Sequence, residues 1–188
     1  MKTVVITGAA GGIGAATAKV FSREGWQVFG VDKFTAEELC LYEDFFVVDL
    51  SDECQIEEFF ASLGKRVSGL DCLVNNAAIQ LCTPLLKTTS KAWDGLMAVN
   101  LRAAFLVMQQ AHPLLCACKG AIVNVGSVHA RATSKNIAAY AVSKGGLETL
   151  TIAAALEFAA DGIRVNGVHP GAVATNMLEA GLSRGHLN

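Results

Sequence analysis

Six short apolar runs recur along the chain, separated by longer segments with amphipathic or alanine-rich patterns. The runs are continuous rather than alternating, which is typical of strands buried on both faces of a sheet. We predict strands at residues 4–7, 28–32, 45–49, 70–75, 121–126 and 163–168. Helices are predicted at residues 12–24, 52–66, 90–115 and 137–160. The second is expected to be capped by Ser51 or Asp52, and the third to break near Asn100.

The alternation of strands and helices along the whole chain predicts an α/β fold. Right-handed crossovers place such strands in a doubly wound parallel sheet between two helical layers, a three-layer α/β/α arrangement of the Rossmann-like type. The strand order expected for this fold is 3-2-1-4-5-6. Because the 188 residues contain no internal repeat or linker, we expect a single domain over residues 1–188.

Charge and composition exclude several kinds of partner. The net charge is -2 and the sequence pI is about 6.1, without a cluster of basic residues, so neither nucleic acid nor a membrane surface is an expected partner. The hydrophobic fraction is 52%, but no apolar run is long enough to span a membrane. The six cysteines include no C-x-x-C pair, which favours reduced thiols in a cytoplasmic protein and no metal site.

A glycine-rich turn follows the first predicted strand directly and opens the first helix. Gly8, Gly12 and Gly14 permit a tight turn, close approach of the backbone to a pyrophosphate, and close packing of helix on strand. The helix, which begins near Ile13, presents its N-terminal N–H groups to the phosphates. Glycines that serve packing alone are the alternative, but their place between strand and helix favours a dinucleotide site.

Acidic residues end the next two predicted strands at the same edge of the sheet. Asp32 is placed to accept hydrogen bonds from the adenosine ribose and to repel a 2′-phosphate, which predicts NAD rather than NADP. Lys33 beside it keeps NADP open. Asp49 and Leu50 are expected near the adenine, although Asp49 can equally belong to the start of the next helix. A solvated turn is the alternative for Asp32.

Tyr140 and Lys144 are spaced to lie one turn apart on one helix face. An ammonium beside a phenol favours the phenolate, so the pair can move a proton near neutral pH. Ser127 ends the fifth apolar run and can donate a hydrogen bond to a substrate oxygen. An incidental pair on a surface helix is the alternative for the tyrosine and lysine.

Taken together, these motifs resemble the short-chain dehydrogenase/reductase family, in its branch of roughly 250 residues. The matching segments occur in the family's order and cover nearly the whole chain. They are residues 7–14, Asn75-Asn76-Ala77-Ala78, Asn100, Ser127, Tyr140-x-x-x-Lys144, Arg164-Val165-Asn166 and residues 170–175. One difference is mild: Ala78 stands where the family usually has glycine.

The resemblance implies a role for each motif residue. Tyr140 is the expected acid/base, and Ser127 is expected to hold the substrate oxygen. Lys144 is expected to bind the nicotinamide ribose and to lower the pKa of the tyrosine. Asn100 is expected to bend its helix and to hold a water that links Lys144 to solvent. The activity implied is hydride transfer between NAD(H) and a secondary alcohol or ketone.

The resemblance also completes a set of residues for the cofactor. Asn76 and Ala77 are expected beside the adenosine ribose, whereas Val173, through its backbone, and Thr175 are expected to secure the nicotinamide carboxamide. The cofactor-binding set is then Gly8, Gly12, Ile13, Gly14, Asp32, Asp49, Leu50, Asn76, Ala77, Tyr140, Lys144, Pro170, Gly171, Val173 and Thr175.

The sequence specifies the substrate and the oligomeric partners less narrowly than it specifies the cofactor. Gln80, Val128, His129 and Arg131 flank the proposed catalytic residues and are expected to line the substrate site. No arginine cluster suits a phosphorylated or acidic substrate, which favours a neutral or modestly polar alcohol or ketone. The helices at 101–115 and 137–160 are apolar on more than one face, so we expect a homodimer or homotetramer.

Family members continue for several dozen residues beyond the length of this chain, with substrate-covering helices and a seventh strand. The resemblance therefore implies a chain shortened at its C-terminus, with the sixth strand as an exposed edge. Two alternatives follow for function. One is a dinucleotide-binding or regulatory protein with impaired turnover, and the other is an NADPH-dependent carbonyl reductase of the 3-oxoacyl type.

Overall fold

A computed structural model describes residues 1–183 of the chain. A six-stranded, wholly parallel sheet forms its centre, with the strand order β3-β2-β1-β4-β5-β6, which confirms the predicted doubly wound topology. The strands are β1 (Thr3–Thr7), β2 (Gln27–Asp32), β3 (Asp44–Val47), β4 (Cys72–Asn75), β5 (Ala121–Val125) and β6 (Arg164–Val168).

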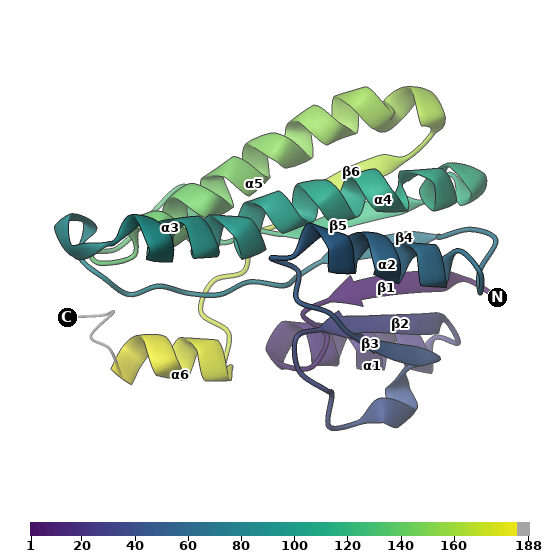
Figure 1. The fold of residues 1–188 in the computed structure, drawn as a ribbon, viewed down its shortest axis with the longest axis horizontal. Helices are drawn as coiled ribbons and strands as arrows, with labels where there is room; N and C mark the ends of the chain where they lie inside the picture. Colours follow the sequence, from purple (N-terminus) through teal and green to yellow (C-terminus); the bar gives the residue numbers. More distant parts are fainter. Residues whose placement is uncertain (184–188) are drawn as a thin grey trace.

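Six α-helices accompany the strands in the described part of the chain (Figure 1). They are α1 (Gly12–Arg23), α2 (Glu53–Leu63), α3 (Ser90–Met97), α4 (Ala103–Cys118), α5 (Ala138–Glu157) and α6 (Asn176–Ser183). Asp52 caps α2 by accepting a hydrogen bond from the Cys54 N–H at 3.0 Å. A π-helical segment, Ala98–Arg102, separates α3 from α4 and confirms the predicted break near Asn100. None of the helices within residues 1–183 has the length and apolarity needed to cross a membrane.

Two apolar cores lie on opposite faces of the sheet. The larger core packs α2, α4 and α5 against inward-facing residues such as Phe29, Leu73 and Ile122. The smaller core packs α1 against Val4, Ile6 and their neighbours. Because successive side chains of a strand point to opposite faces, each apolar run supplies both cores. These layers hold the carboxyl ends of all six strands at one edge.

Three predicted strands differ from the structure by more than one residue or in burial; one of them is β4, which begins at Cys72 rather than at residue 70. The sequence pattern extends the third strand to residue 49, but β3 ends at Val47, and Asp49 lies in the turn before α2. The sixth run is predicted to be buried on both faces, yet Arg164 and Asn166 of β6 are exposed. Within residues 1–183, β6 is an edge strand that pairs with β5 alone, and Val165 packs into the larger core.

Candidate active site

A cavity of about 1090 Å³ opens where the strands end, at the point where the strand order reverses between β1 and β4. In open α/β sheets this position binds ligands. Most of the predicted site residues line it. They are Gly8, Gly12, Ile13, Asp32, Asp49, Leu50, Asn76, Ala77, Gln80, Ser127, Val128, His129, Tyr140, Lys144, Pro170, Gly171, Val173 and Thr175.

The glycine-rich turn uses its glycines for different purposes. Gly8 and Gly12 have φ of +65° and +52°, a region that residues with a Cβ rarely adopt. Gly14 does not line the cavity; a Cβ there would lie 2.0 Å from the Gly8 carbonyl oxygen, so this glycine permits close packing of α1 on β1. Within residues 1–183 no side chain caps α1 at Gly11, so the first N–H groups of the helix lack a capping partner where Gly11, Gly12 and Ile13 line the cavity. This cradle fits a pyrophosphate.

Asn76 and Ala77 brace this turn from the end of β4. The Asn76 side-chain amide donates hydrogen bonds to the carbonyl oxygens of Thr7 and Gly8, both at 3.0 Å. The Thr7 hydroxyl accepts from the backbone N–H groups of residues 76 and 77 at 3.0 and 3.1 Å. A Cβ at Gly8 would lie 2.8 Å from the Ala77 Cα. The glycine-rich turn and the segment at Asn76 and Ala77 therefore form one rigid wall of the cavity.

Asp32 connects the glycine-rich turn with the segment after β2. Its carboxylate accepts hydrogen bonds from the Ala10 N–H at 3.0 Å and the Phe34 N–H at 3.2 Å. The side chain also borders the cavity, as the sequence predicts. The bonds to residues 10 and 34 hold the carboxylate in place, so it is fixed before any ligand arrives.

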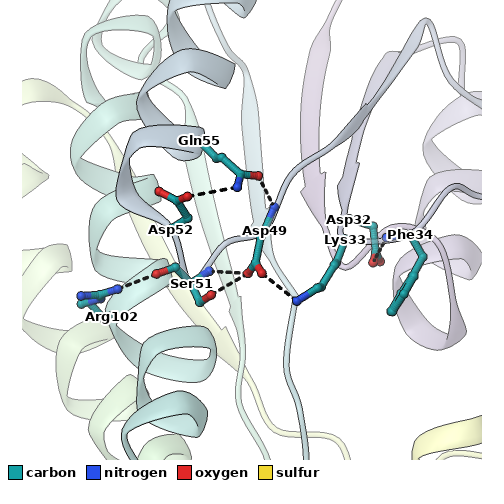
Figure 2. Close-up of polar contacts among 8 residues, drawn as sticks. All are labelled: Asp32, Lys33, Phe34, Asp49, Ser51, Asp52, Gln55 and Arg102. Atoms are coloured by element: carbon teal, nitrogen blue, oxygen red, sulfur yellow. Dashed lines mark hydrogen bonds and ion pairs between the residues drawn. The ribbon is translucent and has the colours of Figure 1, made fainter.

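Lys33 and Asp49 form an ion pair across the ends of β2 and β3, with 2.7 Å between Nζ and Oδ2 (Figure 2). The other oxygen of Asp49 accepts from the Ser51 N–H at 3.0 Å and from its hydroxyl at 2.7 Å. The hydrogen bonds from Lys33 and Ser51 lower the pKa of Asp49 to about 2. Asp49 therefore stays ionised and holds the ammonium of Lys33.

Ser127 and Tyr140 meet on the opposite side of the cavity. Both side chains are buried, with 6% and 8% of their surface exposed. Burial raises the pKa of Tyr140, and a hydrogen bond with Ser127 opposes that rise. Burial outweighs the hydrogen bond, so the pKa of Tyr140 lies above the ordinary value for a phenol.

The Lys144 side chain reaches the end of β5. Its ammonium donates a hydrogen bond to the Val125 carbonyl oxygen at 2.7 Å and lies 5.8 Å from the centre of the Tyr140 ring. The side chain is 2% exposed, and burial lowers the pKa of Lys144 to about 8. The end of β5 thus positions both Lys144, through Val125, and Ser127, two residues later.

Asn100 lies in the π-helical segment behind the cavity rather than in its wall. Its side-chain oxygen accepts from the Ile79 N–H at 2.8 Å, and its amide donates to the Ile79 carbonyl at 2.9 Å and to the Ser143 hydroxyl at 3.1 Å. The Ser143 hydroxyl in turn donates to the Tyr140 carbonyl at 2.7 Å. Asn100 therefore joins the loop after β4 to the first turn of α5.

The predicted substrate residues separate into two groups. Gln80, Val128 and His129 line the cavity, and the His129 ring lies 6.2 Å from that of Tyr140. Arg131 does not line it in the described structure; its guanidinium pairs with Glu148 at the surface. The sequence places Arg131 near the site because it is close in the chain to Ser127, but the short helix Val128–Ala130 turns it away.

Thr175 directly precedes α6, which borders the other side of the same cavity. The Thr175 hydroxyl accepts from the Leu178 N–H at 3.4 Å, as an N-cap does. A Cβ on Gly12 would lie 3.1 Å from the methyl group of Thr175. Met177 and Leu178 also line the cavity. The segment after β6 thus packs against the glycine-rich turn.

Sequence reasoning missed a buried chain of polar residues beneath the site. The Asn75 amide donates to the Asn124 side-chain oxygen, and the Asn124 amide donates to the Thr151 hydroxyl, both at 2.9 Å. The Thr151 hydroxyl donates to the Leu147 carbonyl at 2.6 Å. These bonds join β4, β5 and α5. The signal was the polar Asn124 in an otherwise apolar run.

The chain matches a known family over nearly its whole length. The model of the short chain dehydrogenase family matches residues 2–184. A 3-oxoacyl-[acyl-carrier-protein] reductase of Thermotoga maritima is 36% identical over an alignment 188 residues long. The alignment covers 95% of this chain and 76% of the relative. Further relatives are named as dehydrogenases.

Solved structures show the same fold. A 4-hydroxyisoleucine dehydrogenase complexed with NADH superposes with a TM-score of 0.87 at 32% identity, covering 96% of this chain and 79% of the other. A metagenomic short-chain oxidoreductase in complex with NADP gives a TM-score of 0.85 at 32% identity, covering 92% and 83%. These relatives bind nicotinamide dinucleotides of both kinds.

Proposed function

The chain belongs to the short-chain dehydrogenase family, and from this premise we propose that it transfers a hydride between NAD(H) and a secondary alcohol or ketone, with Tyr140 as the acid/base. One observation carries the proposal. Ser127 and Tyr140, which hydrogen-bond to each other, and the buried Lys144 line the same cavity as the glycine-rich turn. A dinucleotide on that turn and a substrate oxygen at Tyr140 therefore share one cavity.

When bound, the cofactor supplies or accepts the hydride. In the direction of reduction, Tyr140 donates its phenolic proton to the substrate oxygen while Ser127 donates a hydrogen bond to the same oxygen. In the direction of oxidation, the phenolate accepts the hydroxyl proton, and the nearby ammonium of Lys144 stabilises its charge.

Lys144, Asn100 and the nicotinamide-side residues have supporting roles in this proposal. Lys144 binds the nicotinamide ribose, and Asn100 holds the loop after β4 and the start of α5 in register through Ile79 and Ser143. Val173 and Thr175 lie at the cavity wall near the start of α6, where they can secure the carboxamide.

We propose NAD rather than NADP as the cofactor. Asp32 borders the cavity with a carboxylate that accepts hydrogen bonds from ribose hydroxyls and repels a 2′-phosphate. Lys33 is the basic residue next to it, and its ammonium is held by Asp49 (Figure 2). A 2′-phosphate would have to compete with that carboxylate for the lysine. The carboxylates of Asp32 and Asp49 at the adenosine end of the cavity therefore both disfavour NADP.

We also propose that the 188 residues form one domain, that the protein is cytoplasmic and that it forms a homodimer or homotetramer. The six cysteines are free thiols, which suits a reducing compartment. Large apolar side chains are exposed on the two long helices, among them Phe105 on α4, and Val142, Ile152 and Leu156 on α5. Burying them between copies is favourable. Light scattering after size exclusion measures the assembly.

The activity is tested with a panel of neutral secondary alcohols and ketones, by following the absorbance of NADH. Tyr140→Phe should lower turnover at least about 100-fold, because it removes the transferred proton, while NADH binding stays nearly unchanged. Activity retained in Tyr140→Phe would overturn the acid/base assignment. Binding of NADH without turnover on any substrate would favour the alternative of a dinucleotide-binding or regulatory protein.

A further inference from the structure

A cluster of three different metal-ligating side chains lies outside the cavity. His112 and Cys116 stand one turn apart on α4, and Asp161 ends the short helix η5 (Phe158–Asp161) that follows α5. One ligand atom from each residue lies within 4.8 Å of the other two. In residues 1–183, no other group of three histidine, cysteine or acidic side chains meets this criterion.

The distances within the cluster approach those of a tetrahedral zinc site. Zinc bonds of about 2.0–2.3 Å at tetrahedral angles separate two ligand atoms by roughly 3.3–3.7 Å. The Cys116 sulfur lies 3.6 Å from both ring nitrogens of His112, off the lone-pair axis of each, so the thiol rotates about its Cα–Cβ bond to share an ion with Nε2. The His112 Nε2 lies 3.0 Å from the Asp161 Oδ2, joined by a hydrogen bond. Replacing that shared proton with a metal requires the pair to open by only a few tenths of an ångström.

The scaffold already orients the three side chains. The His112 ring packs on the Phe158 ring, with 4.8 Å between centres. Phe158 and Cys116 both pack against the larger core, which fixes the backbone on each side of the cluster. Asp161 precedes Gly162, whose φ of +75° turns the chain sharply into β6. Little backbone freedom therefore remains to be lost when a metal binds.

We propose that His112, Cys116 and Asp161 form a zinc-binding site. An imidazole, a thiolate and a carboxylate suit zinc better than the all-oxygen sites of magnesium and calcium. The thiolate and carboxylate together balance the two positive charges of the ion. The side chains of His112 and Asp161 are 32% and 44% exposed, so the ion can enter from solvent and complete its coordination with water.

The proposed zinc site joins two segments at the amino-terminal ends of β5 and β6, whereas Tyr140 lies near the carboxyl ends of the strands. α4 ends just before β5 starts, and η5 lies just before β6 starts (Figure 1). A zinc ion here clamps α4 to the α5–β6 connection and adds stability to the folded chain in proportion to its occupancy. The sequence predicts no metal because it has no C-x-x-C pair and no histidine at the usual ligand spacing from Cys116-x-Cys118, whereas the fold brings the distant Asp161 to His112 and Cys116.

Cobalt(II) reports on such a site directly, because a cysteine thiolate bound to it gives a charge-transfer absorption in the near ultraviolet. The full chain is treated with chelator and reductant, and cobalt is then added. We expect the band to saturate at one ion per chain and to disappear when zinc displaces cobalt. A roughly hundredfold excess of zinc over its Kd should raise Tm by about 5 °C or more.

Variants separate this site from adventitious thiol binding. Cys116→Ser should abolish the band, and Cys118→Ser, which removes an exposed cysteine two residues later on the same helix, should keep it. Asp161→Asn should weaken cobalt binding at least about tenfold, because it removes a charged ligand. Equal Tm values without metal show that the variants fold. No band in the unaltered chain, a band that survives Cys116→Ser, or an Asp161→Asn affinity equal to that of the unaltered chain overturns the site.

Discussion

Lys144 and Lys33 line the same cavity but lie in different electrostatic environments. Lys144 is 2% exposed, has a carbonyl oxygen as its hydrogen-bond partner, and has a pKa lowered by burial. The Lys33 side chain is 61% exposed and pairs with the carboxylate of Asp49. At the catalytic end, protein burial therefore sets the protonation equilibria. At the adenosine end, charge pairing near solvent sets which ligand charges are tolerated.

This comparison teaches where substitutions should matter. A buried group without a counter-charge carries a large free-energy cost that changes with pH, whereas an exposed ion pair contributes about 1 kcal/mol or less. Changes at Ser127 or Lys144 should therefore alter rates and stability strongly. Changes at Asp32 or Asp49 should mainly alter the choice between NAD and NADP.

Ser127→Ala should have the largest effect. Loss of the hydrogen bond to the substrate oxygen is expected to lower kcat by about 100- to 1000-fold. The pKa of Tyr140 should rise further, because Ser127 is the group that lowers it. Ser62→Ala on α2, outside the cavity wall, is the matched control. Steady-state kinetics measure the effect, and a kcat within twofold of the unaltered enzyme would contradict the role of Ser127.

Lys144→Met should change how stability depends on pH. The folded-state pKa of about 8 lies below the ordinary value of 10.5, so between these pH values the unfolded chain binds more protons and stability rises with pH. The gain from pH 7 to above 10.5 amounts to about 3 kcal/mol for this group. Lys144→Met should lack it, whereas the exposed Lys119→Met should keep it. Urea unfolding across this range provides the measurement, and identical pH profiles would show that Lys144 is not desolvated.

Asp32→Ala should change cofactor choice by roughly tenfold. Removing a carboxylate next to the expected 2′-phosphate position removes like-charge repulsion, so the ratio of kcat/KM for NADP to that for NAD should rise. Turnover with NAD should fall because a ribose acceptor is lost. A preference of the unaltered enzyme for NADPH would refute the assignment of Asp32.

Asp49→Asn should have the smallest effect, a rise of roughly threefold in the same ratio, because the Lys33–Asp49 pair is partly exposed. The released ammonium can then meet a 2′-phosphate. The double variant Lys33→Met with Asp49→Asn should lose this gain. If the gain persisted in the double variant, Lys33 would not be its source.

Much of the fold and part of the site can be read from local patterns. The six apolar runs predict the six strands to within a few residues, because burial on both faces leaves a continuous run in any parallel strand. Gly8 and Gly12 predict the turn before α1, since positive φ is a local property. The Tyr140–Lys144 spacing predicts a shared helix face for the same reason.

The relations between distant segments were decided by the tertiary structure alone. The direction of the pKa shift of Tyr140 depends on burial between α5 and the end of β5, which no spacing reveals. The Lys33–Asp49 pair requires the register of β2 on β3, and Asn124 meets Thr151 only when α5 packs on the sheet. A sequence specifies which residues a segment offers. Packing decides which of these residues come into contact and how far water is excluded from them. Electrostatic energies depend on the contacts and on the exclusion of water.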